Sequence, residues 1–476
     1  MKIDVVVPDP ARRWHGLLLE RLAARGHALG VHPVSEVNWP ITMRAALAME
    51  RRIIHRGELS TSIHTTAVQD ATVPDLTIDL TGRPQVAPSS LRIAFAGSFD
   101  DATVATSLAA GHLVDLDVVL DGRSFERAAP MVDNRMFVAA AADDIFARAI
   151  TLMLKAVQRL AAGDRATVPL IAQPDAGLFP LSYVGSSLPR IVREAVRRRA
   201  YRFAHWRVGY RLHDSPGVAE TGDLGQGWSV LPDDGTHFYA DPFPFEHDGR
   251  RYIFVEDYPH ATRKAVISVS EMDEQGVPRV PVPVLEEPHH LSYPQVFSRD
   301  GEIWMLPEGS GSGKLTLYRA ERFPDRWTPV ATLLEGEISD ATLLERNGRF
   351  WLFATDRDGG IGSTSDTLVV FHALALQGPW MPHRCNPILI DRRRARPGGA
   401  VVEVAGRLLL PVQDGTEGYG AGLGLSEIVQ LDVEQVVLGD PQAISDRGDF
   451  PYPKIHTLNR SGSLEVIDGI AAVRKR

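Results

Sequence analysis

Cysteine, export signals and long apolar runs are scarce or missing in this chain. Its 476 residues include one cysteine, Cys385, which cannot form an internal disulfide. No charged segment followed by an apolar segment opens the sequence, and no run of about 18 apolar residues occurs in it. We therefore expect a cytoplasmic protein without a membrane-spanning helix, either free in solution or peripheral to a membrane.

An excess of positive charge and a glycine-rich phosphate loop are also missing. The formal net charge is −9, which gives no overall attraction to nucleic acid, so no nucleic-acid partner is expected. The first apolar run leads into Pro8-Asp9-Pro10, which supplies none of the glycines that cradle a phosphate group. No spaced set of metal ligands occurs, and we expect neither a cofactor nor a metal ion.

A chain of this length exceeds one hydrophobic core, so we expect two domains joined by a linker. The first domain, residues 1–165, opens with a β-branched run over 1–7 and a helical pattern over 17–25 that stops at Gly26. Further apolar runs and a closing helical pattern follow at 76–80, 91–96, 116–120 and 147–162. This alternation predicts an α/β domain with a mostly parallel, Rossmann-like sheet.

Two segments of this domain, DLTIDLTG at 75–82 and DNRMF at 133–137, resemble the N-terminal fold of formyltransferases. That family uses an Asn and a His-Pro on the central loop with a downstream Asp, because formyl transfer needs a general base and stabilisation of a tetrahedral intermediate. After Leu80 this chain has Thr81 to Pro84 instead. We interpret the domain as a degenerate scaffold or docking domain, with formyl transfer as the alternative.

Residues 166–229 are predicted to be a linker that carries a basic amphipathic helix. Pro, Gly and Ser dominate its first part, and the segment 188–211 then holds eight arginines and one glutamate. Apolar residues fall near one helical face of this segment, at Leu188, Ile191, Val192, Ala195 and Phe203. Two interpretations stay open. The helix contacts an anionic membrane surface or a lipid-linked substrate, or it is solvated and its arginines pair with acidic neighbours.

The second domain, residues 230–476, contains an internal repeat. In each copy an apolar strand runs into a turn glycine, and a second strand ends in a polar or acidic residue. The copies span 240–257, 292–309, 339–356, 395–414 and 451–468. Their spacing of roughly 50 residues suits one four-stranded blade per copy, so we expect an all-β five-bladed propeller.

The residues that head the repeats should meet in the central channel, because the first strand of each blade lines it. They are Asp241, Tyr293, Asp340, Arg396 and Tyr452. Charged groups are costly to bury without partners, so this set indicates a polar pocket. The repeats also end in acids, namely Glu256, Glu308, Asp356 and Asp414. These acids are either turn carboxylates at the blade edge or further site residues, and the two glutamates are the better candidates.

The first and third copies resemble five-bladed propeller glycosidases, a group that includes arabinanases, xylosidases, invertases and levanases. The resemblance is carried by Ala240-Asp241-Pro242 before DGRRYIF and by Ser339-Asp340 before NGRFWLF. It implies that Asp241 is the base or nucleophile and that Asp340 tunes acidity and orients the substrate. The family's proton donor lies in blade four, where this chain has Arg396 to Gly399. We therefore assign the acid to Glu308 or Glu256.

Two carboxyl groups on opposite sides of a glycosidic bond, one ionised and one protonated, would hydrolyse it. Clustered acids raise one another's pKa, so the glutamate acid is expected to stay protonated near neutral pH while Arg396 holds Asp340 ionised. The side chains expected to contact the sugar are Tyr293, Tyr452, His289, His290, Arg396 and Asp414. The histidines could instead cap a loop, and the carboxylates could hold Ca²⁺.

Several further segments resemble the N-terminal propeller of glucosamine inositolphosphorylceramide transferases, namely Glu286 to His290, Gly378-Pro379-Trp380 and Arg396-Pro397. In that family the glycosyl transfer belongs to a different domain, so the resemblance implies a sugar or glycolipid substrate without implying a reaction. We expect a carbohydrate-active protein, most simply a glycoside hydrolase. The alternatives are a non-catalytic glycan-binding or scaffold module and a glycosyltransferase component, in glycolipid or surface-polysaccharide biosynthesis.

Overall fold

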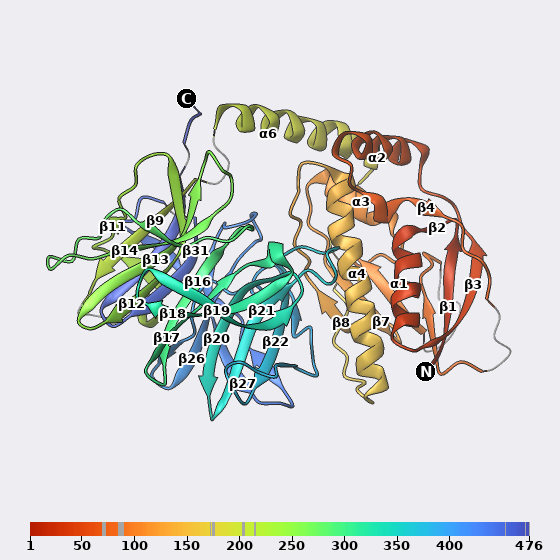
Figure 1. The fold of residues 1–476 in the computed structure, drawn as a ribbon. Helices are drawn as coiled ribbons and strands as arrows, with labels where there is room; N and C mark the ends of the chain where they lie inside the picture. Colours follow the sequence, from red (N-terminus) through yellow and green to blue (C-terminus); the bar gives the residue numbers. More distant parts are fainter. Residues whose placement is uncertain are drawn as a thin grey trace. The chain divides into compact units, whose positions relative to one another are not determined.

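The computed structural model describes the whole chain except residues 69–72, 84–89, 172, 174–176, 202–204, 214–215, 453, 472 and 476. The chain divides into two compact units (Figure 1). The first contains Met1–Arg198 and Ile361–Ser363, and the second contains Arg199–Gly360 and Thr364–Arg476. Within the residues that are described, no helix is both long and apolar enough to cross a membrane.

A six-stranded sheet forms the centre of the first unit, in the order β3-β1-β5-β6-β7-β8. Its strands are β1 (Lys2–Asp9), β3 (Ala28–Ser35), β5 (Leu76–Asp79), β6 (Ser90–Phe95), β7 (Leu116–Leu120) and β8 (Arg123–Ala128). The first four pair in parallel, whereas β7 and β8 pair antiparallel. Asp121 and Gly122, with φ angles of 50° and 77°, form the tight turn between them. The sheet is therefore mixed, with a parallel part from β3 to β6 and an antiparallel part from β6 to β8, and not mostly parallel as expected.

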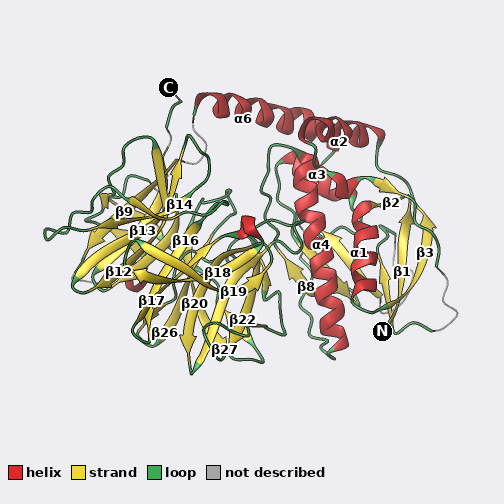
Figure 2. Ribbon diagram, in the orientation of Figure 1, coloured by secondary structure: helices red, strands yellow, loops and turns green. Residues whose placement is uncertain are grey.

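The first unit also contains helices (Figure 2). The longest of them is buried along most of its length. The helices are α1 (Arg13–Ala24), α2 (Ile41–Ile54), α3 (Ala102–Ala110), α4 (Val138–Ala161), α5 (Phe179–Ser182) and α6 (Leu188–Ala200), with a π-helical turn over Tyr183–Ser187. Smaller elements are β2 (Ala11–Arg12), β4 (Ser62–Ile63) and a 3-10 turn over Glu58–Ser60. Trp14 of α1 stacks on Phe146 of α4 with ring centroids 5.5 Å apart, which joins the two helices in one core.

The described part of the second unit forms five four-stranded blades, which confirms the expected propeller. Blade one is β12 (His237–His247), β13 (Arg250–Pro259), β14 (Val266–Glu271) and β15 (Val282–Leu285). Blade two is β16 (Ser292–Arg299), β17 (Glu302–Glu308), β18 (Lys314–Arg322) and β19 (Arg326–Glu335). Blade three is β20 (Ile338–Arg346), β21 (Arg349–Asp356), β22 (Thr367–Ala373) and β23 (Met381–Pro382), with β24 (Leu389–Ile390) also paired to β22.

Blade four is β25 (Val402–Val404), β26 (Arg407–Gln413), β27 (Leu423–Leu431) and β28 (Val436–Leu438), with β29 (Gln442–Ala443) also paired to β27. Short elements outside the blades are α7 (Val218–Thr221), the pair β10 (Asp223–Gly225) and β30 (Ser445–Gly448), and a 3-10 turn over Ser310–Ser312. Apolar side chains fill the spaces between neighbouring blades. Phe254 and Val269 of blade one, for example, belong to one cluster with Met305 of blade two.

Blade five joins strands from both ends of the second unit, in the order β11-β9-β32-β31. β31 (Ile455–Ser461) and β32 (Leu464–Ala471) come from the end of the chain, and β9 (His205–Leu212) and β11 (Ser229–Val230) come from the segment predicted to be a linker. The arginines of this segment suggested a helix as far as residue 211. Residues 205–212 instead place apolar residues at every second position, namely Trp206, Val208, Tyr210 and Leu212, which is a strand pattern, and α6 ends at Ala200. Phe203, assigned to the helix face, lies outside the described residues.

Candidate functional site in the propeller

In four blades the inner strand contains a bulge, at which two consecutive residues leave the regular pairing. In β12, β16, β20 and β31 the register skips the pairs 241–242, 293–294, 340–341 and 456–457. Asp241, Tyr293 and Asp340 adopt φ angles of 48°, 48° and 49°, a left-handed conformation that is strained for residues other than Gly. Such strain is typical of functional sites, and the structure places these three repeat-heading residues in equivalent positions.

The equivalent residue in blade five is His456, whereas the sequence repeat pointed to Tyr452. Tyr452 lies before β31 and packs edge-to-face on Phe450, with ring centroids 5.4 Å apart, in an apolar cluster. The turn glycine Gly462 follows His456 by six residues, whereas Gly249 follows Asp241 by eight. Because this hairpin is shorter, an alignment on the glycine assigns the wrong residue to the channel.

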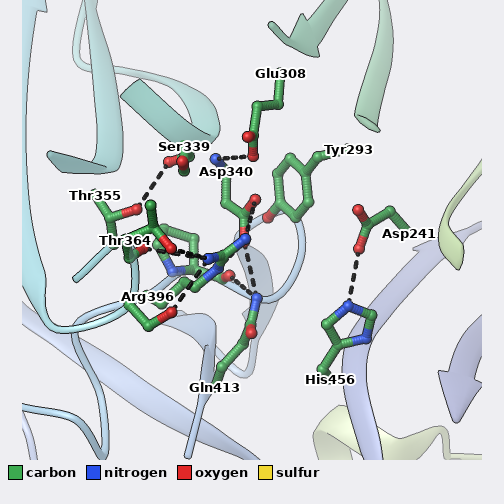
Figure 3. Close-up of polar contacts among 12 residues, drawn as sticks. Asp241, Tyr293, Glu308, Ser339, Asp340, Thr355, Thr364, Arg396, Gln413 and His456 are labelled. Carbon is green, nitrogen blue, oxygen red and sulfur yellow. Dashed lines mark hydrogen bonds and ion pairs between the residues drawn. The ribbon is translucent and has the colours of Figure 1, made fainter. Parts of the chain in front are cut away.

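Asp340 is enclosed by donors from blade four (Figure 3). Arg396 donates to its carboxylate from Nε at 2.6 Å and from Nη2 at 3.1 Å, and Gln413 Nε2 donates at 2.8 Å. The Nη1 group of Arg396 donates to the carbonyl and hydroxyl oxygens of Thr364, both at 3.2 Å. Arg396 and Asp340 are both buried. The sequence analysis paired these two residues, and the structure brings them together in a buried, multiply bonded ion pair.

Asp241 belongs to a different chain of contacts, which runs through His456 to Asp468. His456 Nε2 lies 3.3 Å from Asp241 Oδ1, and His456 Nδ1 lies 2.6 Å from Asp468 Oδ1. Asp468 also accepts the backbone N–H groups of Asp241, His456 and Thr457. Since Asp468 acts as an acceptor throughout, Nδ1 of His456 donates to it and Nε2 is left to exchange a proton with Asp241. The His456 ring also stacks on Trp206 at 3.9 Å, which fixes its orientation.

Glu256 and Glu308 occupy equivalent positions at the ends of the second strands. Glu256 pairs opposite Ala240, and Glu308 pairs opposite Ser292. Glu256 Oε1 lies 3.2 Å from His290 Nε2. Glu308 accepts the backbone N–H of Asp340 at 3.2 Å and the Ser310 hydroxyl at 2.8 Å. Glu308 is therefore the acid that lies next to the ion pair of blades three and four.

The other two acids at the repeat ends make turn contacts. Asp356 accepts the backbone N–H of Asp358 at 2.9 Å, and Asp414 accepts that of Thr416 at 2.8 Å. Each lies one residue beyond the position of Glu308, since Thr355 pairs opposite Ser339 in blade three. These contacts match the turn-carboxylate interpretation of the two aspartates.

A pocket of about 780 Å³ lies over this part of the channel. Of the expected site residues, those that line it are Asp241, Glu256, Glu308, His290 and Arg396. Tyr293, Asp340, Tyr452, His289 and Asp414 are not among the described lining residues; Tyr293 is fully buried, with its hydroxyl 2.8 Å from the Thr342 hydroxyl. The sequence analysis missed several aromatic lining residues, namely Trp206, Phe238, Tyr258, His260 and Tyr419. They lie outside the repeat-heading positions, so the repeat carried no signal for them.

Burial and mutual repulsion change the proton affinities of the pocket acids. Burial and the nearby charge of Asp340 together raise the pKa of Glu308 to about 8. Burial also raises the pKa of Asp241 well above its ordinary value, and the charges of Glu256 and Asp340 act in the same direction. For His290, burial lowers the pKa, but the hydrogen bond to Glu256 and the nearby negative charges outweigh it and raise the pKa overall.

Asp241, His456 and Asp468 are also the one described group of side chains whose potential metal-ligand atoms lie within 4.8 Å of one another. The hydrogen bonds already given account for this arrangement without an ion. Asp468 uses both carboxylate oxygens as acceptors, and His456 uses Nδ1 as a donor. A ligand set for Ca²⁺ would instead be rich in carboxylate and carbonyl oxygens free to face the ion.

The first unit has a smaller cavity, of about 290 Å³, at the carboxyl ends of its parallel strands. Pro10, Glu36, Gly82 and Asp101 line it from the segments after β1, β3, β5 and β6. Neither Asn nor His occurs among the described residues that line this cavity. The catalytic trio of formyltransferases is therefore not assembled there, as the segment after Leu80 suggested.

The propeller is similar in sequence to proteins of a known family. Residues 231–437 match the family model described as glucosamine inositolphosphorylceramide transferase 1, N-terminal. The resemblance of the sequence to the N-terminal propeller of these transferases is confirmed. The transferase of Arabidopsis thaliana is 33% identical over 203 residues, 42% of this chain and 26% of its own length. That of Oryza sativa subsp. japonica is 32% identical over 248 residues, 49% of this chain and 33% of its own length.

This chain thus spans about a quarter to a third of the length of these curated transferases. The family match includes Asp241, Glu308, Asp340 and Arg396 but ends before β31 and β32. Among solved structures, an alpha-L-arabinanase from Cellvibrio cellulosa complexed with arabinohexaose is 17% identical with a TM-score of 0.32, covering 43% of this chain and 77% of that chain.

Proposed function

We propose that the propeller pocket binds a sugar-containing ligand and hydrolyses a glycosidic bond in it. The observation that carries this proposal is that two acids with different surroundings line the same pocket. Glu308 has a pKa of about 8, and Asp241 lies 3.3 Å from His456 Nε2. Glycoside hydrolysis needs one protonated and one ionised carboxyl group at neutral pH. An acid with a pKa near 8 keeps its proton under those conditions.

The pocket walls also suit a sugar. Trp206, Phe238, Tyr258 and Tyr419 offer aromatic faces on which the C–H groups of a sugar ring can pack. The carboxyl groups and Arg396 offer acceptors and donors for its hydroxyl groups. A pocket of about 780 Å³ has room for one or two sugar rings, since ligand pockets of a few hundred Å³ hold drug-sized molecules.

In the proposed reaction, Glu308 gives its proton to the glycosidic oxygen as the bond from that oxygen to the anomeric carbon breaks. Asp241, in its ionised form, takes a proton from the attacking water as the water oxygen bonds to the anomeric carbon. His456 Nε2 can accept this proton from Asp241, because its Nδ1 proton is held by Asp468. The chain thus supplies one proton to the leaving group and removes one from the nucleophile.

This assignment departs from the propeller glycosidase pattern at two residues. Asp340 binds Arg396 and Gln413 with its carboxylate, so we give it an electrostatic role and no proton transfer. Its charge is one of the causes that raise the pKa of Glu308. The proton donor then comes from the end of β17 in blade two and not from blade four, whose corresponding segment holds Arg396.

The test is to incubate the full-length protein with a panel of aryl glycosides that includes pentofuranosides, and to compare Asp241→Asn with the wild type. We expect release of the aryl group by the wild type and a loss of about 100-fold or more in kcat for Asp241→Asn, because general base catalysis contributes about 10²- to 10⁴-fold. Asp414→Asn is the matched control, since Asp414 lies outside this pocket. Unchanged release by Asp241→Asn would sink the proposal.

A pH profile adds a second check. The value of kcat/KM should decline as pH rises through about 8, where Glu308 loses the proton that it must donate. It should also decline on the acid side, at a pH well above the ordinary aspartate range, because the pKa of Asp241 is raised. A profile that stays flat up to pH 10 would remove Glu308 from the role of acid.

A binding module or a component of a glycosyltransferase is the alternative, and the transferase relatives favour it because they contain more than this propeller. On a glycan array, binding that survives Asp241→Asn, without any cleavage by the wild type, would support this alternative. The substrate would then be a sugar or glycolipid, and a lipid-linked substrate would require contact with a membrane. A cytoplasmic location, free or peripheral to a membrane, stays a prediction from the sequence.

The formyltransferase likeness of the first unit also stays a proposal. The mixed sheet has the expected early strands, and its cavity lies at their carboxyl ends. Since no Asn or His among the described residues lines that cavity, the scaffold or docking role remains the better supported one.

A further inference from the structure

The helical segment 179–200 packs on the first unit over its first half. Tyr183 is buried and its hydroxyl donates to Glu50 at 2.9 Å. Ser187 is also buried and donates to the carbonyl oxygen of Ala109 at 3.1 Å. Arg190 donates to the carbonyl oxygen of Leu108 at 3.0 Å. These bonds fix the direction in which α6 leaves the first unit, while α6 itself contains no buried residue.

A row of aliphatic side chains along this segment is exposed. Leu181, Val184, Leu188, Val192 and Val196 are 71, 64, 38, 63 and 63% exposed. Their spacing of three or four residues places them on one face of the helix. A helix that is simply solvated has no reason to present such a face to water, because each exposed aliphatic side chain costs free energy. The row, which we call the apolar face, is thus left uncovered by the residues that the structure describes.

Helix α6 is also strongly basic. Its 13 residues contain five arginines and one glutamate, Glu194. Glu194 pairs with Arg197 at 2.6 Å and with Arg198 at 2.9 Å. Glu194, together with Glu50, whose charge acts on Arg190, cannot neutralise five guanidinium groups, so α6 keeps a net positive charge. The solvated-helix interpretation, in which acidic neighbours pair with the arginines, therefore explains only part of the charge and none of the apolar face.

We propose that this segment docks on an anionic lipid surface, with the apolar face in the boundary between head groups and acyl chains and the arginines at the level of the lipid phosphates. An apolar face bordered by arginines is complementary to such a surface in both polarity and charge. A second copy of this chain would match the apolar face but would bring five more arginines against it. The proposal stands on this helix alone and does not require the propeller to be a hydrolase.

The experiment is flotation of the full-length protein with phosphatidylcholine vesicles that either contain or lack phosphatidylserine. We expect the protein to float with the phosphatidylserine vesicles and to float far less with phosphatidylcholine alone. High salt should weaken the binding, because screening removes the attraction between arginines and lipid charges. Equal flotation with both vesicle types, or none with either, would overturn the proposal.

Variants separate the apolar face from a general effect of added charge. Val192→Glu with Val196→Glu should reduce vesicle binding by about 10-fold or more, because both apolar contacts are lost and negative charge faces the lipid. Leu374→Glu is the matched control, since Leu374 is 73% exposed in the second unit, and it should float like the wild type. Circular dichroism checks that each variant is folded.

Size-exclusion chromatography tests the rival occupant. If the wild type is a dimer without lipid, and Val192→Glu with Val196→Glu makes it monomeric, then a second copy covers the apolar face and the membrane proposal is wrong. A wild type whose oligomeric state does not change in the double variant, together with loss of flotation in that variant, supports the lipid surface.

Discussion

Asp241 and Asp340 occupy the same position in their blades, yet their surroundings differ. Each is the first unpaired residue of the bulge in its inner strand, and both adopt nearly the same left-handed backbone conformation. Asp340 binds Arg396 and Gln413, whereas Asp241 contacts His456 (Figure 3). The charges of Glu256 and Asp340 also act on Asp241. The fold therefore provides two equivalent positions for a carboxyl group, and side chains from the neighbouring blades determine its chemical role.

This difference assigns the two aspartates to different tasks. A carboxylate that binds a guanidinium group and an amide has little freedom to exchange protons. A carboxyl group with a raised pKa, in contact with a histidine and on the wall of a pocket, is suited to accept one. The polar residues of the channel thus form two groups. Blades three and four supply a fixed side, in which Asp340 is bound by Arg396 and Gln413, and blades one, two and five supply a reactive side, which contains Asp241, Glu308 and His456.

Arg396→Met should have the largest effect, because it removes the group that distinguishes Asp340 from Asp241. It leaves a buried carboxylate without its cation, and breaking such a pair costs about 3–5 kcal/mol. We expect a correspondingly lower midpoint of urea unfolding, followed by tryptophan fluorescence of the full chain. The double variant Arg396→Met with Asp340→Asn should recover much of the loss, since it removes the unpaired charge as well.

An exposed ion pair of the same type serves as the control. Arg322 and Asp325 form a hydrogen-bonded pair at 2.6 Å on the surface of blade two. Arg322→Met should change the unfolding midpoint little, because water already solvates both charges. If Arg396→Met unfolds at the same urea concentration as Arg322→Met, the buried pair does not fix Asp340 and the comparison between the two aspartates fails.

Glu308→Gln should have the next largest effect, on the pH dependence of stability. The pKa of Glu308 is about 8 in the folded protein and has a normal value of 4.5, so the folded state binds this proton more tightly. The resulting stabilisation is complete below about pH 4.5 and is lost as pH rises through about 8. The difference between 4.5 and about 8 corresponds to at most roughly 5 kcal/mol, since one pKa unit corresponds to about 1.4 kcal/mol.

The measurement is the melting temperature of the wild type and of Glu308→Gln between pH 5 and about 9. The wild type should lose stability across this range relative to the variant, because the amide carries no proton to lose. Glu274→Gln, at an exposed position of the loop after β14, should follow the wild-type curve. Parallel curves for the wild type and Glu308→Gln would mean that Glu308 titrates normally.

The sequence was sufficient to predict the propeller and three of its channel positions. Asp241, Tyr293 and Asp340 follow the same apolar spacing and precede turn glycines at the same distance, so a repeat alignment finds them. Arg396 was found because it heads the fourth copy, and its ion pair with Asp340 follows from simple charge complementarity. These residues share a local pattern, which is the kind of information that a single sequence contains.

The reactive side was harder to predict because long-range pairing creates it. Asp468 ends the fifth repeat copy, but it lies at the position where blade one has Val255, one residue before that of Glu256, so the repeat did not mark it as a partner of Asp241. Trp206 comes from β9, which pairs with β32 from the far end of the second unit's sequence. Tyr419 comes from the segment between β26 and β27. Trp206 and Tyr419 carry no repeat signal, and the role of all three residues depends on residues that are distant in the sequence.

His456→Gln should have the smallest effect of the three and tests the reactive side directly. Glutamine keeps a polar group of similar size next to Asp241 but cannot take up a proton. We expect kcat to fall by about 10-fold with KM nearly unchanged, because the variant loses part of the general base contribution while the pocket walls remain. The acid-side limb of the pH profile should move to lower pH, because Asp241 loses the Nε2 acceptor that favours its protonated form.

The pH profile separates this role from a structural one, since His456 is buried against Trp206 and its loss also lowers stability. His289→Gln is the matched control, because His289 is next to His290 in sequence but does not belong to the described lining of the pocket. A destabilised pocket would change KM or the amount of active protein and leave the pH limbs in place. If His456→Gln keeps the wild-type limbs, Asp241 works without a proton relay, and its difference from Asp340 rests on the absence of a cation alone.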